Sequence, residues 1–178
     1  MPAVSVVMSV YNGQEFLAEA VESVAGQTFS DFEFVIVDDG STDATADILA
    51  EYAKRDRRVR VLRHENRGRP ESLNRGIEAA TAPLIARMDA DDVSLRQRFE
   101  QQVEFMRARP DVVLLGGAAE LITPERRTLR VYQPPTEDTE LRATLLRHNP
   151  FRHPALMLRR EAVLGVGGYR KALLDADD

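Results

Sequence analysis

Residues 84–92 read Leu-Ile-Ala-Arg-Met-Asp-Ala-Asp-Asp, a short and mostly apolar run that ends in three carboxylates. A run of this length is typical of a buried strand, and the polar residues after it then lie at the carboxyl end of that strand. In open α/β sheets this end is where ligands bind. The stretch therefore predicts a strand over 84–88, followed by a loop that contacts a ligand.

Asp89, Asp91 and Asp92 bring three negative charges together, which is unfavourable unless a cation lies among them. Asp89 and Asp91 are two residues apart, so in extended backbone their side chains share a face. Carboxylate oxygens suit Mg²⁺ or Mn²⁺, and these ions commonly hold a phosphorylated ligand as well. A polar turn that caps the next helix would explain the same residues. The triplet alone leaves both interpretations open.

The sequence before this stretch alternates between strand and helix patterns with short links, which predicts an α/β fold. Its sheet should be mainly parallel, with helices on both faces. Parallel strands end at the same edge, so the loops at 11–13, 38–40 and 89–91 should meet in one cleft. Strands are predicted over 4–10, 32–37, 59–62 and 84–88, and helices over 14–25, from an N-cap at Ser41 to 52, from Pro70 to 80, and over 95–106.

The second half of the chain has a different pattern, and we expect a single domain over 1–178. Two of its strands, 118–122 and 129–132, flank a turn at 124–127 and predict a hairpin or a mixed-sheet extension. The chain ends soon after the apolar pair 173–174, which predicts that further helices follow in the complete protein. The other predicted elements are a strand over 112–115, a helix from an N-cap at Thr136 to 145, a loop over 149–154, a strand over 155–158 and a flexible stretch over 165–168.

Composition narrows the possible functions. The chain has 178 residues, 43% of them hydrophobic and 30% charged, as expected for a globular domain with a real core. It has no cysteine, which excludes disulfides, zinc–thiolate sites and thiol catalysis. The net charge of −5 argues against a nucleic-acid partner. We expect no signal peptide and no transmembrane segment, because no basic leader or apolar run of about 20 residues is present.

Five motifs follow one another along the chain: Val-Ser-Val-Val-Met-Ser-Val-Tyr-Asn-Gly at 4–13, Val-Ile-Val-Asp-Asp-Gly-Ser-Thr-Asp at 35–43, Asn-Arg-Gly at 66–68 with Leu-Asn-Arg-Gly-Ile at 73–77, Met-Asp-Ala-Asp-Asp at 88–92, and His-Pro-Ala-Leu-Met at 153–157 with Gly-Gly-Tyr at 167–169. Taken together, they resemble family 2 glycosyltransferases. They occur in the family's order and cover nearly the whole chain. The resemblance implies a GT-A (Rossmann-like) fold, in which a nucleotide-binding half at 1–110 and an acceptor-side half at 111–178 share one continuous sheet.

The resemblance also implies a reaction. It is the transfer of a sugar, with inversion at the anomeric carbon, from a nucleotide-sugar to an acceptor hydroxyl, assisted by Mn²⁺ or Mg²⁺. A UDP-sugar is the default donor, and the acceptor would be a polysaccharide, a lipid-linked sugar or a protein. We expect a cytoplasmic location or one at the inner face of a membrane.

The resemblance assigns roles to individual residues. Asp91, with Asp89, would bind the metal, and the ring of Tyr11 would stack on the base. Asp39 would accept a hydrogen bond from an imide N–H of the base, although Asp38 could exchange roles with it and either could cap the following helix. The family's Glu-Asp pair aligns with Asp177–Asp178, which makes Asp178 the general base and Asp177 its neighbour. The residues expected to contact the nucleotide are Tyr11, Val37, Asp39, Arg69, Asp89 and Ala90.

Some alternatives stay open. Arg67, Arg69 and His153 would be phosphate or metal contacts, or else solvated or structural side chains. A sugar nucleotidyltransferase would need a glycine-rich basic loop near the N-terminus, which residues 9–14 do not form. A phospho-acceptor signalling module would need a lysine at the end of its last strand, where this chain has none. A further alternative is a chain that binds a nucleotide without transferring a sugar.

Overall fold

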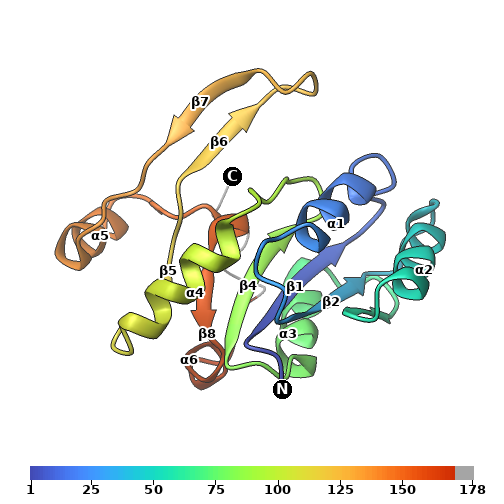
Figure 1. Ribbon diagram of the computed structural model, residues 1–178, viewed down its shortest axis with the longest axis horizontal. Coiled ribbons are helices and arrows are strands. Elements are labelled where there is room, and N and C mark those ends of the chain that lie inside the picture. Colours follow the sequence, from blue (N-terminus) through green and yellow to red (C-terminus); the bar gives the residue numbers. More distant parts are fainter. Residues whose placement is uncertain (171–178) are drawn as a thin grey trace.

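A computed structural model describes residues 1–170, so Asp177 and Asp178 lie outside the described part of the chain. Six strands form one sheet in the order β3-β2-β1-β4-β8-β5 (Figure 1). The first four strands pair in parallel, and β8 runs antiparallel to both β4 and β5. The predicted mainly parallel sheet is therefore confirmed. Its strands are β1 (Val4–Val10), β2 (Phe32–Asp38), β3 (Val59–Arg63), β4 (Leu84–Asp89), β5 (Leu114–Leu115) and β8 (Met157–Arg159).

Helices cover both faces of the sheet, because successive strand residues point to opposite sides. On one face, alternate residues of β1 such as Val6 and Met8 pack under α1 (Leu17–Ala25), α2 (Thr45–Arg55) and α4 (Arg98–Ala108). On the other face, Val7 and Ile85 pack under α3 (Arg69–Ala79) and α6 (Arg160–Gly165). The sheet thus has two separate cores, and Figure 1 shows the helices in front of it and behind it.

The second half departs from expectation in several places. β6 (Ala119–Ile122) and β7 (Thr128–Tyr132) form their own two-stranded sheet, so the hairpin is confirmed and the mixed-sheet extension is wrong. Figure 1 shows this hairpin and α5 (Asp138–Leu145) standing away from the main sheet. A short 3₁₀ helix, η1 (His153–Ala155), and α6 are additional, since elements this short leave no helical periodicity in the sequence. Among the described residues, none of the helices is long and apolar enough to span a bilayer.

Two predicted helix caps are wrong. The Ser41 hydroxyl accepts a hydrogen bond from the Asn12 N–H (3.0 Å), and α2 begins four residues later. The Asp43 carboxylate instead accepts the Thr45 N–H at the start of α2 (3.0 Å). Thr136 likewise precedes the residue that flanks α5 and makes no cap. A capping residue was expected from its type alone, but the bond across 29 residues to Asn12 takes the Ser41 hydroxyl.

Candidate metal and nucleotide site

The loops that follow β1, β2 and β4 meet at the carboxyl edge of the sheet. β1 lies between the other two strands, with Val10 paired to Asp38 and Ser9 paired to Asp89. Asp39 and Asp91 therefore follow the two strands that flank β1, at the same edge. This is the convergence that the strand–helix alternation predicts.

Hydrogen bonds tie the loop after β1 to the loop after β2. The Gly13 N–H donates to the Thr45 hydroxyl (2.9 Å), and the Asn12 side-chain oxygen accepts the Thr42 N–H (2.9 Å). The ring of Tyr11 is left 52% exposed beside these contacts. A fixed loop with an open aromatic face suits stacking of a planar ligand group.

Asp38 and Asp39 are buried and occupied by their own loops. The two carboxylate oxygens of Asp39 accept the N–H groups of Arg67 and Gly68, each at 2.9 Å. One oxygen of Asp38 accepts the Ser41 N–H (2.9 Å), and the other lies 3.2 Å from Nε of Arg63. Both residues are at most 3% exposed. The pair therefore builds the loops at this edge, and any bond from Asp39 to a base would be additional to these.

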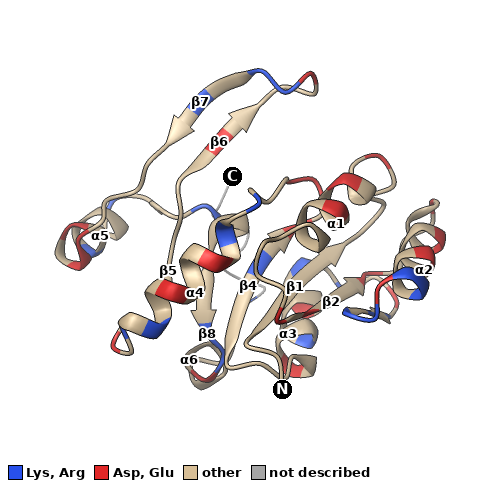
Figure 2. Cartoon of the chain, in the orientation of Figure 1, with Lys and Arg blue, Asp and Glu red and all other residues tan. Residues whose placement is uncertain are grey.

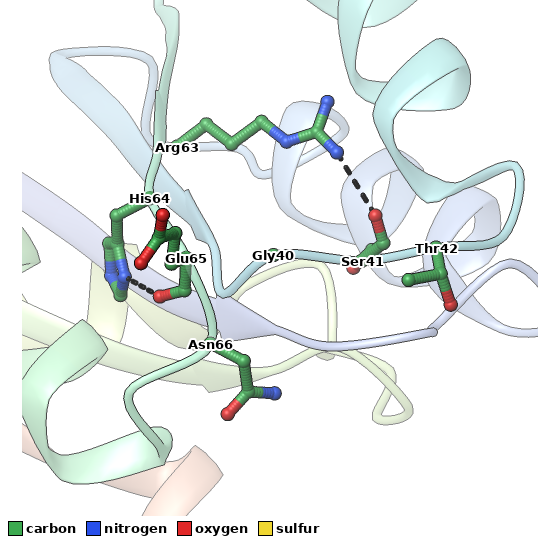
Figure 3. Close-up of a pocket in the computed structure, with 7 residues that line it drawn as sticks. All are labelled: Gly40, Ser41, Thr42, Arg63, His64, Glu65 and Asn66. Atoms are coloured by element: carbon green, nitrogen blue, oxygen red, sulfur yellow. Dashed lines mark hydrogen bonds between the residues drawn. The ribbon is translucent and has the colours of Figure 1, made fainter.

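A pocket of about 590 Å³ lies where β2 and β3 end. In Figure 3, Arg63 reaches across it and donates to the carbonyl oxygen of Ser41 (3.0 Å). On the opposite wall Nδ1 of His64 lies 2.6 Å from the carbonyl oxygen of Glu65. The residues that line it are mostly polar in type, but most of the surface that they present to the pocket is formed by carbon atoms. The pocket is lined by Gly40, Ser41, Thr42, Arg63, His64, Glu65 and Asn66.

The carboxylates of Asp89, Asp91 and Asp92 gather at the end of β4, with one oxygen of each within 4.8 Å of the others. The chain turns at residues 90–91, so this turn brings them together, and the extended backbone expected for Asp89 and Asp91 is wrong. Burial and the two neighbouring carboxylates raise the pKa of Asp92 to about 6. The cluster therefore carries negative charge that the protein compensates only in part.

Arginines surround one member of this cluster. Arg87 makes a close ion pair with Asp89, and Nη2 of Arg69 lies 3.5 Å from the same carboxylate. Arg87 is the basic residue of β4, visible as the blue segment of that strand in Figure 2. Among residues 1–170, Asp91 and Asp92 form no ion pair. Two open carboxylates beside a third that is held in place are a donor set that fits Mg²⁺ or Mn²⁺.

The remaining predicted contacts are placed as follows. Val37 is fully buried and packs beside Gly76 of α3, so its side chain lies in the core and faces no open pocket. Ala90 is partly exposed and lies next to Gly13. A larger residue in place of Gly13 would collide with the Val10 side chain. His153 packs edge-to-face on Tyr169, with ring centroids 6.1 Å apart.

Sequence reasoning missed Arg87, Asn74 and Tyr169 as residues that shape the site. A signal for Arg87 was available, because a charged residue two positions before Asp89 in a buried strand must lie on the same face as that carboxylate. Asn74 and Tyr169 are 95 residues apart, and their contacts require the tertiary fold. Spacing alone does not reveal such a pair.

A family model and a named relative both match nearly the whole chain. The family model of glycosyl transferase family 2 matches residues 5–167. The chain is 34% identical over 176 residues to the amylovoran biosynthesis glycosyltransferase AmsE of Erwinia amylovora, and the match covers 97% of this chain and 66% of AmsE. The chain thus spans about two thirds of the length of this relative.

Solved structures share the fold at lower identity. The mannosyltransferase PcManGT from Pyrobaculum calidifontis, in complex with GDP-Man and Mn²⁺, has a TM-score of 0.71 and 22% identity over 95% of this chain and 48% of its own. S. aureus TarS 1-349 in complex with UDP has a TM-score of 0.70 and 21% identity over 98% and 52%. The expected GT-A architecture is confirmed by these matches. By its sequence and its fold, the chain belongs to glycosyl transferase family 2.

Proposed function

We propose that this chain is the donor-binding part of a glycosyltransferase that uses Mn²⁺ or Mg²⁺ to hold a nucleotide-sugar and transfers the sugar to an acceptor hydroxyl. The observation that carries the proposal is the grouping of Asp89, Asp91 and Asp92 within 4.8 Å at the sheet edge that also presents the exposed Tyr11 ring. Such a site supplies anionic metal ligands and a stacking surface, which are the two features a nucleoside diphosphate needs.

The chain's own residues have distinct roles in this proposal. Asp91 and Asp92 would hold the metal ion, and Asp89 would complete the cluster in an orientation fixed by Arg87. Arg69, with a side chain 49% exposed, can turn towards a diphosphate. A bound divalent ion stabilises the negative charge that develops on a diphosphate leaving group.

The base of the nucleotide would stack on Tyr11, next to the loops held by Asp39. An ionised carboxylate has about four lone-pair sites, so Asp39 retains acceptor capacity beyond its two backbone bonds. The pocket bounded by residues 40–42 and 63–66 is the neighbouring space at the same edge. These features support a nucleoside bound across the ends of β1 and β2, with its diphosphate towards β4.

The finer assignments rest on the family motifs and the similar proteins. We propose a UDP-sugar as donor, since a similar structure contains UDP, while another contains GDP-Man with Mn²⁺. We propose polysaccharide or glycoconjugate synthesis because AmsE is named for amylovoran biosynthesis. Inversion, with Asp178 as general base beside Asp177, rests on the motif alignment, because both residues lie outside residues 1–170.

A thermal-shift panel tests the donor proposal. UDP-, GDP- and dTDP-sugars are added to the chain with Mn²⁺ or with a chelator, because a ligand that binds only the folded state raises the melting temperature. We expect the largest rise for a UDP-sugar, and only when Mn²⁺ is present. An equal rise in chelator would contradict metal-dependent binding. A sugar-transfer assay on the same sample then separates an active enzyme from a chain that only binds.

A further inference from the structure

Arg87 occupies an unusual place for a charged residue. In β4, Ile85 and Arg87 lie on the face covered by α3, while Ala86 and Met88 belong to the opposite core. Arg87 is only 1% exposed. Burying a guanidinium is costly unless the charge is paired, so its surroundings must supply strong compensation.

Polar and charged groups surround the Arg87 guanidinium. Asp89 forms the ion pair already described, and the Tyr169 hydroxyl approaches the guanidinium without the geometry of a well-formed hydrogen bond. Burial raises the pKa of Tyr169, and the charge of Arg87 opposes that rise. None of the three guanidinium nitrogens makes a well-formed hydrogen bond to the described part of the chain. Asp89 and Tyr169 are thus the direct polar neighbours that the structure gives the Arg87 guanidinium, beside the longer-range charges of Asp92 and Arg98.

Tyr169 is itself fixed by α3. The Asn74 side-chain nitrogen donates to the Tyr169 carbonyl oxygen (2.8 Å), and the Tyr169 N–H donates to the Asn74 side-chain oxygen (2.7 Å). Gly167 and Gly168 precede it with φ of 84° and 70°, and a Cβ on Gly168 would collide with the Asn74 side-chain oxygen. Only glycine allows this approach, so the turn is built to hold Tyr169 in one place.

We infer that Tyr169 is a positioning residue for the metal cluster. Clamped to α3 by Asn74, it holds the Arg87 guanidinium against Asp89 and thereby fixes the Asp89 carboxylate beside Asp91 and Asp92. The inference rests on the proposed function, since it assumes that the cluster binds a divalent ion. It gives the Gly167–Tyr169 turn, in the second half of the chain, a role in the donor site of the first half.

The test compares Tyr169→Phe with the matched control Tyr52→Phe, whose hydroxyl bonds Ala18 and Glu22 away from the site. Calorimetry measures the Kd of Mn²⁺ alone, and of UDP with Mn²⁺ and with chelator. We expect Tyr169→Phe to weaken Mn²⁺ binding and Mn²⁺-dependent UDP binding by about tenfold, as for other groups that orient metal ligands. Binding of UDP in chelator and the melting temperature without ligand should match those of the control.

The outcomes separate this inference from the proposed function. If the unaltered chain binds no Mn²⁺ with UDP, the proposed function fails. If it binds and Tyr169→Phe has the same Mn²⁺ affinity as Tyr52→Phe, the positioning role is refuted. Arg87→Lys is the second variant, because it keeps the charge but loses the planar guanidinium. It should weaken Mn²⁺ binding too, and unchanged Mn²⁺ affinity in a folded Arg87→Lys protein would also refute the inference.

Discussion

Two acidic motifs lie at the ends of the strands that flank β1, and they differ in how the rest of the chain contacts them. After β2, Asp38 and Asp39 are buried, and three of their four oxygens accept backbone N–H groups. After β4, Asp91 and Asp92 make no ion pair within residues 1–170 and crowd against Asp89. Similar sequence patterns thus give one pair that shapes the backbone and one cluster to which we assign a metal ion.

The two motifs differ in the kind of partner that their carboxylates receive. Asp39 receives the N–H groups of Arg67 and Gly68, which return to it from the loop between β3 and α3. The loop after β4 receives charged side chains instead, with Arg87 and Arg69 directed at Asp89. Backbone donors are fixed partners of a carboxylate, whereas carboxylates that crowd together repel one another unless a cation lies among them.

The largest effect should come from Asp91→Ala, which removes an open ligand and should weaken Mn²⁺-dependent UDP binding by about 100-fold or more. The melting temperature without ligand should stay the same or rise, because one repulsive charge is gone. Isothermal calorimetry measures the affinity, with Asp47→Ala, an exposed acid on α2, as control. If Asp91→Ala binds UDP and Mn²⁺ like the control, the contrast between the two motifs is wrong.

Asp39→Asn should act mainly on stability. An amide offers one acceptor oxygen for two partly buried N–H groups, so we expect a loss of about 2 kcal/mol in the free energy of unfolding. Chemical denaturation measures this loss, and Asp91→Asn is the matched variant that should cause none. The ratio of the UDP affinities with and without Mn²⁺ should be the same in Asp39→Asn as in the unaltered chain. If Asp39→Asn were as stable as the unaltered chain but bound UDP equally well with and without Mn²⁺, the two motifs would have the opposite roles.

The open motif should also depend on pH, since the pKa of Asp92 is about 6. Protons compete with the metal, so Mn²⁺ affinity should fall about fourfold between pH 7.5 and 5.5. The raised pKa means that the folded chain binds this proton more tightly than the unfolded chain. Stability without metal should therefore rise as the pH falls through about 6.

Titrations of Mn²⁺ and melting curves across this range check both signs. Asp92→Asn should flatten the melting profile near pH 6, because it removes the titrating group. If Mn²⁺ affinity and metal-free stability both rose or both fell as the pH falls, the assignment of this titration to Asp92 would be contradicted.

The smallest effect should come from Arg69→Gln. Its ion pair with Asp89 is long and half-exposed, so stability should hardly change. If Arg69 turns to the diphosphate, UDP affinity with Mn²⁺ should fall about threefold and uridine affinity should not change, with the difference shrinking at high salt. Equal losses for UDP and uridine would show that Arg69 does not contact the diphosphate.

The sequence allows the four parallel strands and the acidic loop to be predicted, because their apolar runs and polar endings are local features. Ser41 shows where such reasoning fails, since its hydroxyl bonds Asn12 from another loop. Val37 shows a related limit, because the packing of α3 decides which way its side chain faces, and its contact with a nucleotide stays a prediction. Arg87 is a charged residue in a buried strand, and its sequence neighbours do not explain it. The tertiary fold does, because it places Tyr169 near Arg87. The prediction is strongest where a feature depends on neighbours in sequence.

The most direct test is anomalous diffraction from crystals of the chain grown with UDP and Mn²⁺. The account predicts one manganese peak within coordination distance of the Asp91 and Asp92 carboxylates and of the diphosphate, with the base against Tyr11. A peak elsewhere, or a bound nucleotide with no metal at the Asp89–Asp92 cluster, would contradict it.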